Sequence, residues 1–396
     1  MKTKPKVCVF RVGWQPFIEV PLWNLADALV ARGADVTIVK SLARTDLGMG
    51  EEAHPRAKCI FIGLFFKRVA KIPGLTMAAR LLGWVEYVLR CVVLGLREDA
   101  GVYAAIDVDA FPAAWICARL RGRKCVLYAY ELYADRPGIS PRRFWLWLER
   151  VLTRHADLVV ACEPNRARLM QERSGLATLP MVVQNVPQRG AAPARTTRIA
   201  DLFAARGIAD PRIAYYHGWI NSNRCAESFV EALPLLPENA VLFFVGPGEP
   251  AFKDALAARA KALGVDNRVI FHGLVPSEEL LEWTASAHLG LQVQRNAGLN
   301  SYYCAPIKVF QYFAAGLPVL APNFPGMLDL VERQELGLCV DPESVEAIAG
   351  GMRRLLFDDS FRERCAANAL RLAEERYCYE VEARELVDTL WGYATA

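Results

Sequence analysis

KVCVFRV (6–12), VPLWNLADALVARG (20–33) and ADVTIVK (34–40) are the stretches that decide the fold. The first and third are short apolar runs with the length and composition of β-strands, whereas the second has apolar residues at helical spacing and ends in Gly33. A strand, a helix and a strand at this spacing form a βαβ unit, in which the two strands run parallel. The N-terminal part of the chain is therefore predicted to be an α/β domain with a parallel sheet.

The same alternation continues through the rest of the chain. Further strand-like runs of this first series are KCIFIG (58–63), GVYAAID (101–107), KCVLYAY (124–130) and ADLVVAC (156–162). A second series begins at RIAYYHG (212–218), after QRGAAPARTTR (188–198), which lacks apolar periodicity and suits a linker. With 396 residues the chain can bury two cores. We predict doubly wound domains over 1–187 and 188–370, then a C-terminal helix over 371–396 that can return to the N-terminal domain.

The composition is typical of a globular protein. Hydrophobic residues make up 53% of the chain and charged residues 23%, and no segment has the polar bias of a disordered tail. The 11 cysteines form no C-x-x-C pair, and several lie inside apolar runs, so we interpret them as packed free thiols and expect no metal site. The N-terminal apolar run is shorter than the core of a signal peptide. We therefore expect a cytoplasmic protein.

Charge is distributed unevenly between the two halves. Residues 1–186 carry 27 Lys+Arg and 17 Asp+Glu, a net of +10, whereas the remaining residues have a net of −6. A basic half favours an anionic acceptor or an anionic membrane surface, and a solvated positive face without a partner is the simpler alternative. We expect no nucleic-acid partner.

Two helical segments place bulky apolar residues beside basic ones. They are MAARLLGWVEYVLRCVVLGLRE (77–98) and RRFWLWLERVLTRH (142–155). A spanning helix needs about 20 mostly apolar residues, and charged residues interrupt both segments. We expect either peripheral contact at the inner face of a membrane or burial against the first sheet.

Two strand ends carry candidate binding residues, because ligands of open parallel sheets bind beyond the carboxyl ends of the strands. Gly13 follows the first strand and lets the backbone approach a ligand, but G-x-G-x-x-G is absent, which argues against a nicotinamide dehydrogenase. Gly218 ends a later strand, and Arg224 precedes the next helix, where its guanidinium could bind a diphosphate. A plain turn at Gly13 and a solvated arginine at Arg224 are the simpler alternatives.

The segment from Asn300 to Gly316 carries a stronger signal. Pro306 suits the first turn of a helix, where its missing N–H costs nothing. Lys308 then lies in that turn, where the helix dipole disfavours a cation unless an anion is near. Gln311 lies roughly one turn deeper on the same face, and its amide can bond hydroxyl groups. The segment therefore predicts a phosphate-plus-ribose site.

NSYYCAPIKVFQYFAAGLPV (300–319) resembles the stretch N-Y-x-x-x-x-P-N-K-x-F-E-Y-x-A-A-G-x-P-V of the family-four retaining glycosyltransferases. Other segments are similar to family segments in order and spacing: ARGADVTIV (31–39), AIDVDAFPAAWICARL (105–120), CVLYAYELY (125–133), ADLVVACEPNRARLM (156–170), VGPGEP (245–250), VIFHGLVPSEELLEWTASAHLGL (269–291) and GLCVDPESVEAIAGGM (337–352). The resemblance covers nearly the whole chain. It implies the GT-B fold, in which two Rossmann-like domains face each other.

The resemblance also implies roles for residues at matching positions. Arg224 and Lys308 would bind the donor diphosphate as catalytic cations, and Asp107 would orient the acceptor hydroxyl. The implied donor-binding residues are Gly13, Gly218, Leu274, Val275, Asn300, Pro306, Ile307 and Gln311. Among them, the backbone at Leu274 and Val275 would hold the base and Gln311 the ribose. On the acceptor side, the implied residues are Glu131 and Tyr130.

Five positions depart from the family pattern. Trp219 stands where the family has a second cation, and Tyr303 and Gln311 stand where it has glutamates. Ile307 replaces an asparagine, and Tyr130 replaces a histidine that could titrate near neutral pH. Glutamine keeps the ability to bond a hydroxyl but loses the charge, so we expect weakened ribose binding.

The implied activity is transfer of a sugar, with retention, from a UDP- or GDP-type sugar to a glycan, a lipid-linked intermediate or a small molecule, as in the synthesis of surface polysaccharides. No tightly bound cofactor is implied. Cations at the departing diphosphate would then be the largest catalytic term. One alternative is a metal-dependent GT-A enzyme that uses Asp107 and Asp109 as a D-x-D site. Another is a catalytically degenerate nucleotide-sugar-binding partner subunit, which Trp219, Gln311 and Tyr130 favour.

Overall fold

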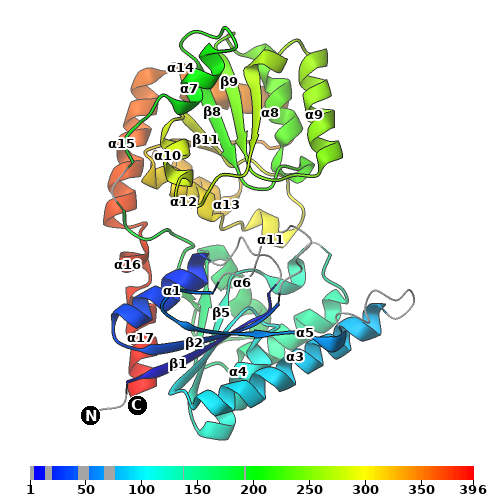
Figure 1. Cartoon of the computed structure of the whole chain (residues 1–396), viewed down its shortest axis with the longest axis vertical. Coiled ribbons are helices and arrows are strands. Elements are labelled where there is room, and N and C mark those ends of the chain that lie inside the picture. The colour runs from blue at the N-terminus through cyan, green and yellow to red at the C-terminus, as the bar shows by residue number, and fades with distance from the viewer. Residues whose placement is uncertain (1–3, 14–19, 43–52, 67–75, 137, 191–192) are drawn as a thin grey trace. The chain divides into compact units, whose positions relative to one another are not determined.

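The computed structural model describes residues 4–13, 20–42, 53–66, 76–136, 138–190 and 193–396 (Figure 1). It divides into two compact units. Unit 1 comprises Met1–Gln184 together with Tyr379–Ala396, and unit 2 comprises Asn185–Cys378. Each unit is built on one parallel sheet with helices on both faces, which confirms the predicted α/β class.

The sheet of unit 1 has the strand order β3-β2-β1-β4-β5-β6-β7 in the described part of the chain. The strands are β1 (Lys6–Arg11), β2 (Asp35–Ser41), β3 (Lys58–Ile62), β4 (Val102–Ile106), β5 (Lys124–Ala129), β6 (Leu158–Ala161) and β7 (Met181–Val182). β1 lies in the middle and pairs in parallel with β2 and β4, so that Val9 has Ile38 on one side and Ala104 on the other. Because the strand order reverses at β1, ligands are expected beyond its carboxyl end.

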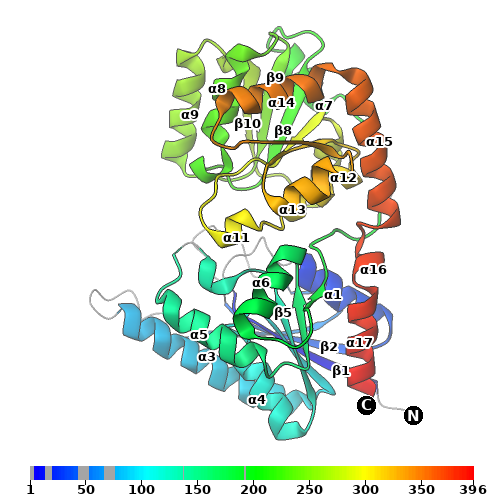
Figure 2. The same ribbon diagram turned by 180° about the vertical axis from the view of Figure 1, so that it is seen from behind.

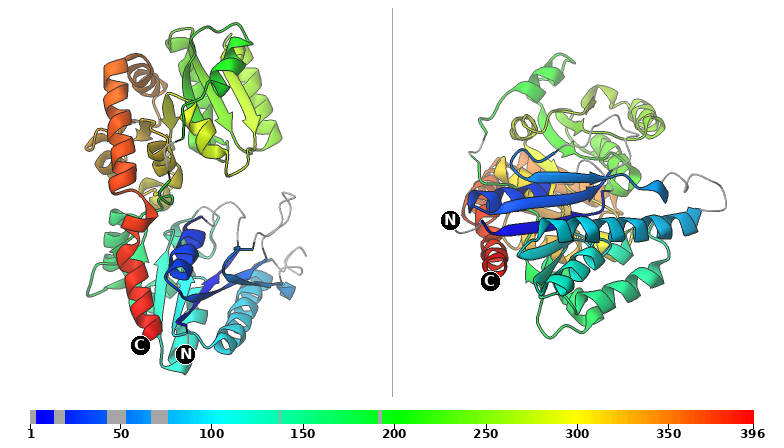
Figure 3. Two further views of the ribbon diagram at one scale, coloured as in Figure 1. Left: turned by 60° about the vertical axis from the view of Figure 1, so that its left-hand side comes forward. Right: turned by 60° about the horizontal axis from the view of Figure 1, so that its bottom comes forward.

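Helices cover both faces of this sheet. They are α1 (Val20–Ala31), α3 (Thr76–Glu98), α4 (Phe111–Arg121), α5 (Arg142–Thr153) and α6 (Pro164–Ser174). Right-handed crossovers put α3 and α4 on one face, where Gly95 of α3 lies against Phe10 and Cys117 without room for a Cβ. The C-terminal helices α16 (Tyr379–Glu382) and α17 (Arg384–Thr395) belong to this unit, and α17 runs beside α1 (Figure 3). The guanidinium of Arg32 pairs with Asp388 and lies over the ring of Trp391.

The last helical segment differs from the expected one over 371–396. Helix α15 (Asp359–Glu375) continues past residue 371, and the tail crosses to unit 1 only after Cys378. The reason is packing, because the ring centroid of Tyr377 lies 5.3 Å from that of Phe310 and 6.1 Å from that of Phe313.

The sheet of unit 2 has the strand order β10-β9-β8-β11-β12-β13 among the described residues. The strands are β8 (Arg212–His217), β9 (Ala240–Val245), β10 (Val269–Gly273), β11 (Leu289–Leu291), β12 (Val319–Pro322) and β13 (Gly337–Val340). β8 lies between β9 and β11, so the segments that follow β8 and β11 meet at one edge of the sheet.

Helices α8 (Ala226–Ala232), α9 (Pro250–Ala262) and α14 (Val345–Phe357) cover one face of this sheet (Figure 2). Their apolar residues form one buried cluster with Leu242, Phe244 and Leu289 of the strands. Helices α10 (Leu280–Ala285) and α12 (Ile307–Ala314) lie on the other face (Figure 1). Two short helical turns, α11 (Leu299–Tyr302) and α13 (Pro325–Met327), lie between β11 and β12 and between β12 and β13.

The two segments with bulky apolar and basic residues form α3 and α5. In α3, Tyr87 and Cys91 are buried, whereas Leu81, Leu89 and Val93 are 49–61% exposed. The helix therefore packs on unit 1 with one side and leaves an apolar stripe on the other. None of the helices in the described ranges is long and apolar enough to span a membrane.

Candidate functional site

The carboxyl end of β8 is where most of the predicted donor residues of unit 2 gather. β8 ends at His217, and Gly218 follows with φ of 118°, a conformation that favours glycine. A Cβ added at Gly218 would lie 3.2 Å from Nζ of Lys308, and one added at Gly246, after β9, would lie 2.3 Å from the carbonyl oxygen of Gly218. The two glycines therefore let backbone and a lysine ammonium crowd together beyond the sheet.

Lys308 reaches this point from the start of α12. The helix begins at Ile307, and Pro306 precedes it in an extended conformation with ψ of 121°, so the proline caps the helix and is not in its first turn as predicted. The ammonium of Lys308 lies 4.1 Å from the ring centroid of Tyr216. Partial burial and the nearby charge of Arg224 hold the pKa of Lys308 well below its usual value. Within the described ranges, Lys308 has no ion-pair partner.

Arg224 is the last residue of a short 3-10 turn, Ser222–Arg224. Its backbone N–H donates to Oδ1 of Asn221 at 3.1 Å, which closes the turn. Its guanidinium donates to Oε1 of Gln294, a residue that is 2% exposed. Like Lys308, Arg224 has no ion pair with any described carboxylate. Two cations thus stand near each other with only neutral partners.

Gln311 is bonded to His217, a contact that the sequence did not predict. Nε2 of His217 and Oε1 of Gln311 are 2.9 Å apart. Burial, with the charge of Lys308, lowers the pKa of His217 to about 3, so the imidazole is neutral and donates a single N–H. The backbone N–H of His217 also donates to the hydroxyl of Tyr312 at 3.3 Å. One polar atom of Gln311 is therefore committed within the protein, and its binding of ribose stays a prediction.

The other predicted donor residues of unit 2 follow β10, lie in α11 or begin α12. Leu274 follows Gly273 of the edge strand β10 and is 57% exposed. Val275 and Ile307 are half-buried. Asn300 lies in α11, which is tied to the centre because Nε2 of Gln294 donates to the carbonyl of Ser301 at 2.9 Å. Leu274 and Val275 thus stand at the end of β10, two strands from β8.

Trp219 occupies the position where a second cation was expected. Its side chain is 40% exposed, and its carbonyl oxygen accepts a bond of 2.7 Å from the hydroxyl of Tyr216. The contact orients the tyrosine ring beneath the ammonium of Lys308. An exposed, uncharged tryptophan therefore stands at the position where another cation was expected.

Asp107, in unit 1, is held by the protein on both carboxylate oxygens. Oδ1 accepts from the backbone N–H groups of Tyr130 and Glu131 at 2.8 and 3.2 Å, and Oδ2 lies 2.5 Å from a guanidinium nitrogen of Arg11. The side chain thus caps a turn, which is the simpler alternative to its predicted role in orienting an acceptor. These bonds also leave it poorly suited to a D-x-D site with Asp109. Among the described residues, no cluster of three or more His, Cys, Asp or Glu side chains has the arrangement of a metal site.

The remaining candidates of unit 1 also have structural partners. Glu131 forms an ion pair of 2.5 Å with Arg136. The buried ring of Tyr130 packs edge-on against Tyr128 at 4.6 Å. Gly13 donates its N–H to Oγ of Ser41 at 3.0 Å, and an added Cβ would lie 2.2 Å from the carbonyl oxygen of Ser41. Close packing against Ser41 is enough to require glycine at position 13. A ligand role for Glu131, Tyr130 or Gly13 stays a prediction.

Sequence reasoning missed His217 and Gln294 as parts of the site. The sequence contained a signal for each residue. Gln292 and Gln294 interrupt an apolar run at the end of β11, and His217 is a polar residue at the end of β8. Two amides in a strand-like run need buried partners. The partner of Gln294 is distant in the chain, and only the pairing of β8 with β11 brings the two together.

Comparisons with known proteins concern mainly unit 2. Residues 199–371 match the family model described as "Glycosyl transferases group 1". The chain is 28% identical over 181 residues to "Uncharacterized glycosyltransferase MJ1607" of Methanocaldococcus jannaschii, 45% of this chain and 44% of the relative. It is 29% identical over 170 residues to "GDP-mannose-dependent alpha-(1-6)-phosphatidylinositol monomannoside mannosyltransferase" of Mycobacterium tuberculosis, 42% of this chain and 44% of the relative. The chain thus spans less than half the length of these curated relatives.

Solved structures match the whole chain. The structure of Anabaena Alr3699/HepE in complex with UDP has a TM-score of 0.78 at 18% identity and covers 98% of this chain and 100% of its own. WaaG, "a glycosyltransferase involved in lipopolysaccharide biosynthesis", has a TM-score of 0.69 at 17% identity and covers 97% and 99%. At this identity the likeness shows the fold, and the expected GT-B fold is confirmed.

Proposed function

We propose that this chain, whose residues 199–371 belong to the glycosyl transferases group 1 family, transfers a sugar with retention from a nucleoside-diphosphate sugar to an acceptor. One observation carries the proposal: Arg224 and Lys308 lie at the carboxyl end of β8 with neutral partners, Gln294 and Tyr216. Two cations without described carboxylate partners repel each other and lose hydration, so their arrangement favours a bound anion. A diphosphate has the charge to neutralise both.

The same arrangement supplies the chemistry of transfer. As the glycosidic bond to the diphosphate breaks, negative charge grows on the leaving oxygens. Arg224, Lys308 and the N–H groups at the start of α12 can stabilise this charge without reorganising. In the retaining mechanism that the family implies, the leaving phosphate takes the acceptor proton, so no protein base is required. This agrees with the commitment of both oxygens of Asp107 to other groups.

We propose a UDP- or GDP-type donor. A structural neighbour is described in complex with UDP, and a relative is named for GDP-mannose. In this chain the base would lie at Leu274 and Val275 and the ribose near Gln311. The free amide group of Gln311 is the part that can meet a hydroxyl oxygen, because its Oε1 is bonded to His217.

We propose that the acceptor is a glycan or a lipid-linked intermediate, met at the inner face of a membrane. Support comes from the net charge of +10 over residues 1–186 and from the exposed apolar stripe of α3. Arg80 and Arg97 of α3 and Trp147 of α5 are exposed as well. Apolar and basic side chains on one helix suit the surface of an anionic bilayer. Sedimentation with anionic vesicles checks this, and absence of binding at low salt would remove the membrane from the proposal.

The activity itself is tested with a panel of UDP- and GDP-sugars. A true donor raises the melting temperature, because a ligand that binds only the folded state stabilises it. The same donor should be hydrolysed slowly without acceptor and consumed faster with one. Binding without hydrolysis or transfer would instead support the alternative of a degenerate partner subunit. No shift with any nucleotide sugar would overturn the proposal.

A further inference from the structure

We propose that Gln294 is a positioning residue of the donor site, which fixes the guanidinium of Arg224 toward the diphosphate without neutralising it. The inference rests on the proposed function and concerns a residue to which neither the sequence nor the comparisons assigned a role. Gln294 lies beyond the carboxyl end of β11, next to β8, and is 2% exposed.

The direction of the bond follows from chemistry alone. A guanidinium has donors only, so the atom of Gln294 that faces Arg224 must be the carbonyl Oε1. The amide nitrogen of Gln294 then points to the carbonyl of Ser301 and donates at 2.9 Å. Gln292 adds a second donor to the same Oε1 at 3.3 Å. The side chain of Gln294 is therefore held in one orientation by three partners, and a flipped amide would break all three bonds.

The backbone around Arg224 is braced from the same segment. The N–H of Arg295 donates to the carbonyl of Asn223 at 2.9 Å, and its guanidinium donates to Oγ of Ser222 at 3.0 Å. These bonds hold the turn Ser222–Arg224. They leave the long side chain of Arg224 free to rotate, and its bond to Gln294 restricts that freedom.

Restricting Arg224 matters because Lys308 repels it. The charge of Arg224 contributes to the lowered pKa of Lys308, so the two cations interact through a poorly hydrated region. Without an acceptor, Arg224 gains by turning away into solvent. A carboxylate at position 294 would hold it too, but would cancel the charge that the diphosphate needs. An amide supplies the acceptor and keeps the charge. Arg295, by contrast, pairs with Glu343 at 3.4 Å.

The test is a double-mutant cycle between Gln294→Met and Arg224→Ala. Calorimetric titrations with UDP and GDP give the dissociation constant of whichever binds. In the wild-type background, Gln294→Met should weaken binding about 10- to 100-fold, as for a lost hydrogen bond to a charged group. In the Arg224→Ala background it should change binding by less than about twofold, since positioning needs a guanidinium to act on.

Gln334→Met is the matched control. Gln334 is also a partly buried amide of unit 2, and its Oε1 accepts a hydrogen bond of 2.9 Å from the hydroxyl of Tyr377. It has no contact with Arg224 or Gln294 among the described residues, so Gln334→Met should leave nucleotide binding unchanged. Should Gln294→Met fail to fold, Gln294→Glu carries the test, and it should weaken binding at least tenfold in the wild-type background, because its carboxylate offsets the charge of Arg224.

Three results would count against the inference. Equal losses for Gln294→Met in both backgrounds would show a general structural role and overturn the inference while leaving the proposed function intact. Unchanged or tighter binding by Gln294→Glu would overturn the argument from charge. Failure of the wild-type protein to bind either diphosphate would overturn the proposed function, and the inference with it.

Discussion

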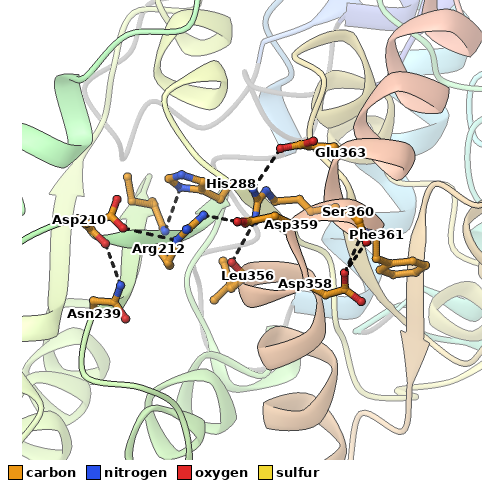
Figure 4. A network of polar contacts seen from close by, with 12 residues as sticks. Asp210, Arg212, Asn239, His288, Leu356, Asp358, Asp359, Ser360, Phe361 and Glu363 are labelled. Atoms are coloured by element: carbon orange, nitrogen blue, oxygen red, sulfur yellow. Dashed lines mark hydrogen bonds and ion pairs between the residues drawn. The ribbon is translucent and has the colours of Figure 1, made fainter.

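The cations near the two ends of strand β8 have different partners, carboxylates at the amino end and neutral groups at the carboxyl end. At the amino end, Arg212 lies 3.0 Å from Asp359 (Figure 4). Asp359 also lies 2.5 Å from Arg362. At the carboxyl end, Arg224 and Lys308 are held by the amide of Gln294 and the ring of Tyr216. The first arrangement is an ion pair within the protein, whereas none of the carboxylates in the described ranges pairs with the second. The comparison separates cations that are paired within the fold from cations that we propose bind a ligand.

The electrostatics of the two ends follow the same division. Arg362 and Arg212 lower the pKa of Asp359, so this carboxylate stays charged through the neutral range. At the other end, desolvation and Arg224 lower the pKa of Lys308, so its charge is disfavoured until an anion arrives. An ion pair supports the charged form at one end, and the surroundings oppose it at the other.

The largest expected effect comes from removing a cation at the carboxyl end. Arg224→Ala or Lys308→Ala should each lower kcat/KM for donor turnover about 100- to 1,000-fold, which corresponds to about 2.7–4 kcal/mol for a lost transition-state donor. Steady-state kinetics with the best donor of the panel measure this. Arg212→Ala is the matched control, and an equal loss of kcat/KM in Arg212→Ala would erase the distinction between the two ends.

A second prediction concerns protons. A bound diphosphate should raise the pKa of Lys308 from its lowered value, so the ligand prefers the protonated protein. Affinity should be highest below the pKa that Lys308 has in the free protein and should level off above the pKa that it has in the complex. In the interval between these two pKa values, affinity should fall as the pH rises. Binding in that interval takes up protons, which calorimetry detects in buffers of different ionisation enthalpy.

Lys308→Met is the control for this measurement, because the phosphates of the ligand titrate in both proteins. The difference in proton uptake between wild type and Lys308→Met belongs to Lys308. Its ammonium lies over the ring of Tyr216, and the charge of Arg224 lowers its pKa. Equal uptake in the two proteins would mean that Lys308 is already fully charged in the free site.

A smaller effect is expected from His217. His217→Phe removes the partner of Gln311 and should cost about 0.5–1.5 kcal/mol of nucleotide affinity, the range for one hydrogen bond. The loss of affinity should be smaller for 2′- and 3′-deoxy nucleotides. These ligands lack the hydroxyl that Gln311 would bond, so loosening Gln311 removes no contact from them. If wild type and His217→Phe discriminate equally against the deoxy ligands, Gln311 does not bind the ribose.

The smallest effect belongs to the amino end. Arg212→Ala breaks a partly exposed ion pair, and the melting temperature should fall by no more than about 2–4 °C, with unchanged nucleotide affinity. Because the pKa of Asp359 is lowered in the folded protein, the contribution of the pair is present at neutral pH and is lost as the pH falls through the folded pKa. The melting temperatures of wild type and Arg212→Ala are measured at neutral and at acidic pH. The difference between the two proteins should be smaller at acidic pH.

Much of the fold could be read from the sequence because it rests on local periodicity. Apolar runs such as 6–12 and 212–218 became buried parallel strands, and the helices between them were predicted by the same pattern. The unfavourable position of Lys308 in a first helical turn also pointed to the site. What could not be read depends on contacts between distant segments, such as Gln294 with Arg224.

The partner of Asp107 could not be predicted from the sequence for the same reason. A strand-end aspartate followed by Val108 and Asp109 has the pattern of both a binding group and a turn cap. The position of Arg11, on the neighbouring strand β1, adds a buried ion pair to the turn cap, and a role of Asp107 toward an acceptor stays a prediction. Pairing between strands assigns such side chains their partners, and the local sequence around Asp107 does not contain that information.

The central claim is that Arg224 and Lys308 bind a diphosphate, and it is tested most directly by the dependence of affinity on phosphate. Calorimetry should compare the binding nucleoside diphosphate with its parent nucleoside in wild type, Arg224→Ala, Lys308→Ala and Arg212→Ala. We predict a large preference for the diphosphate in wild type and Arg212→Ala that falls at least tenfold in each of the other two variants. An unchanged preference in Arg224→Ala and Lys308→Ala would contradict the account.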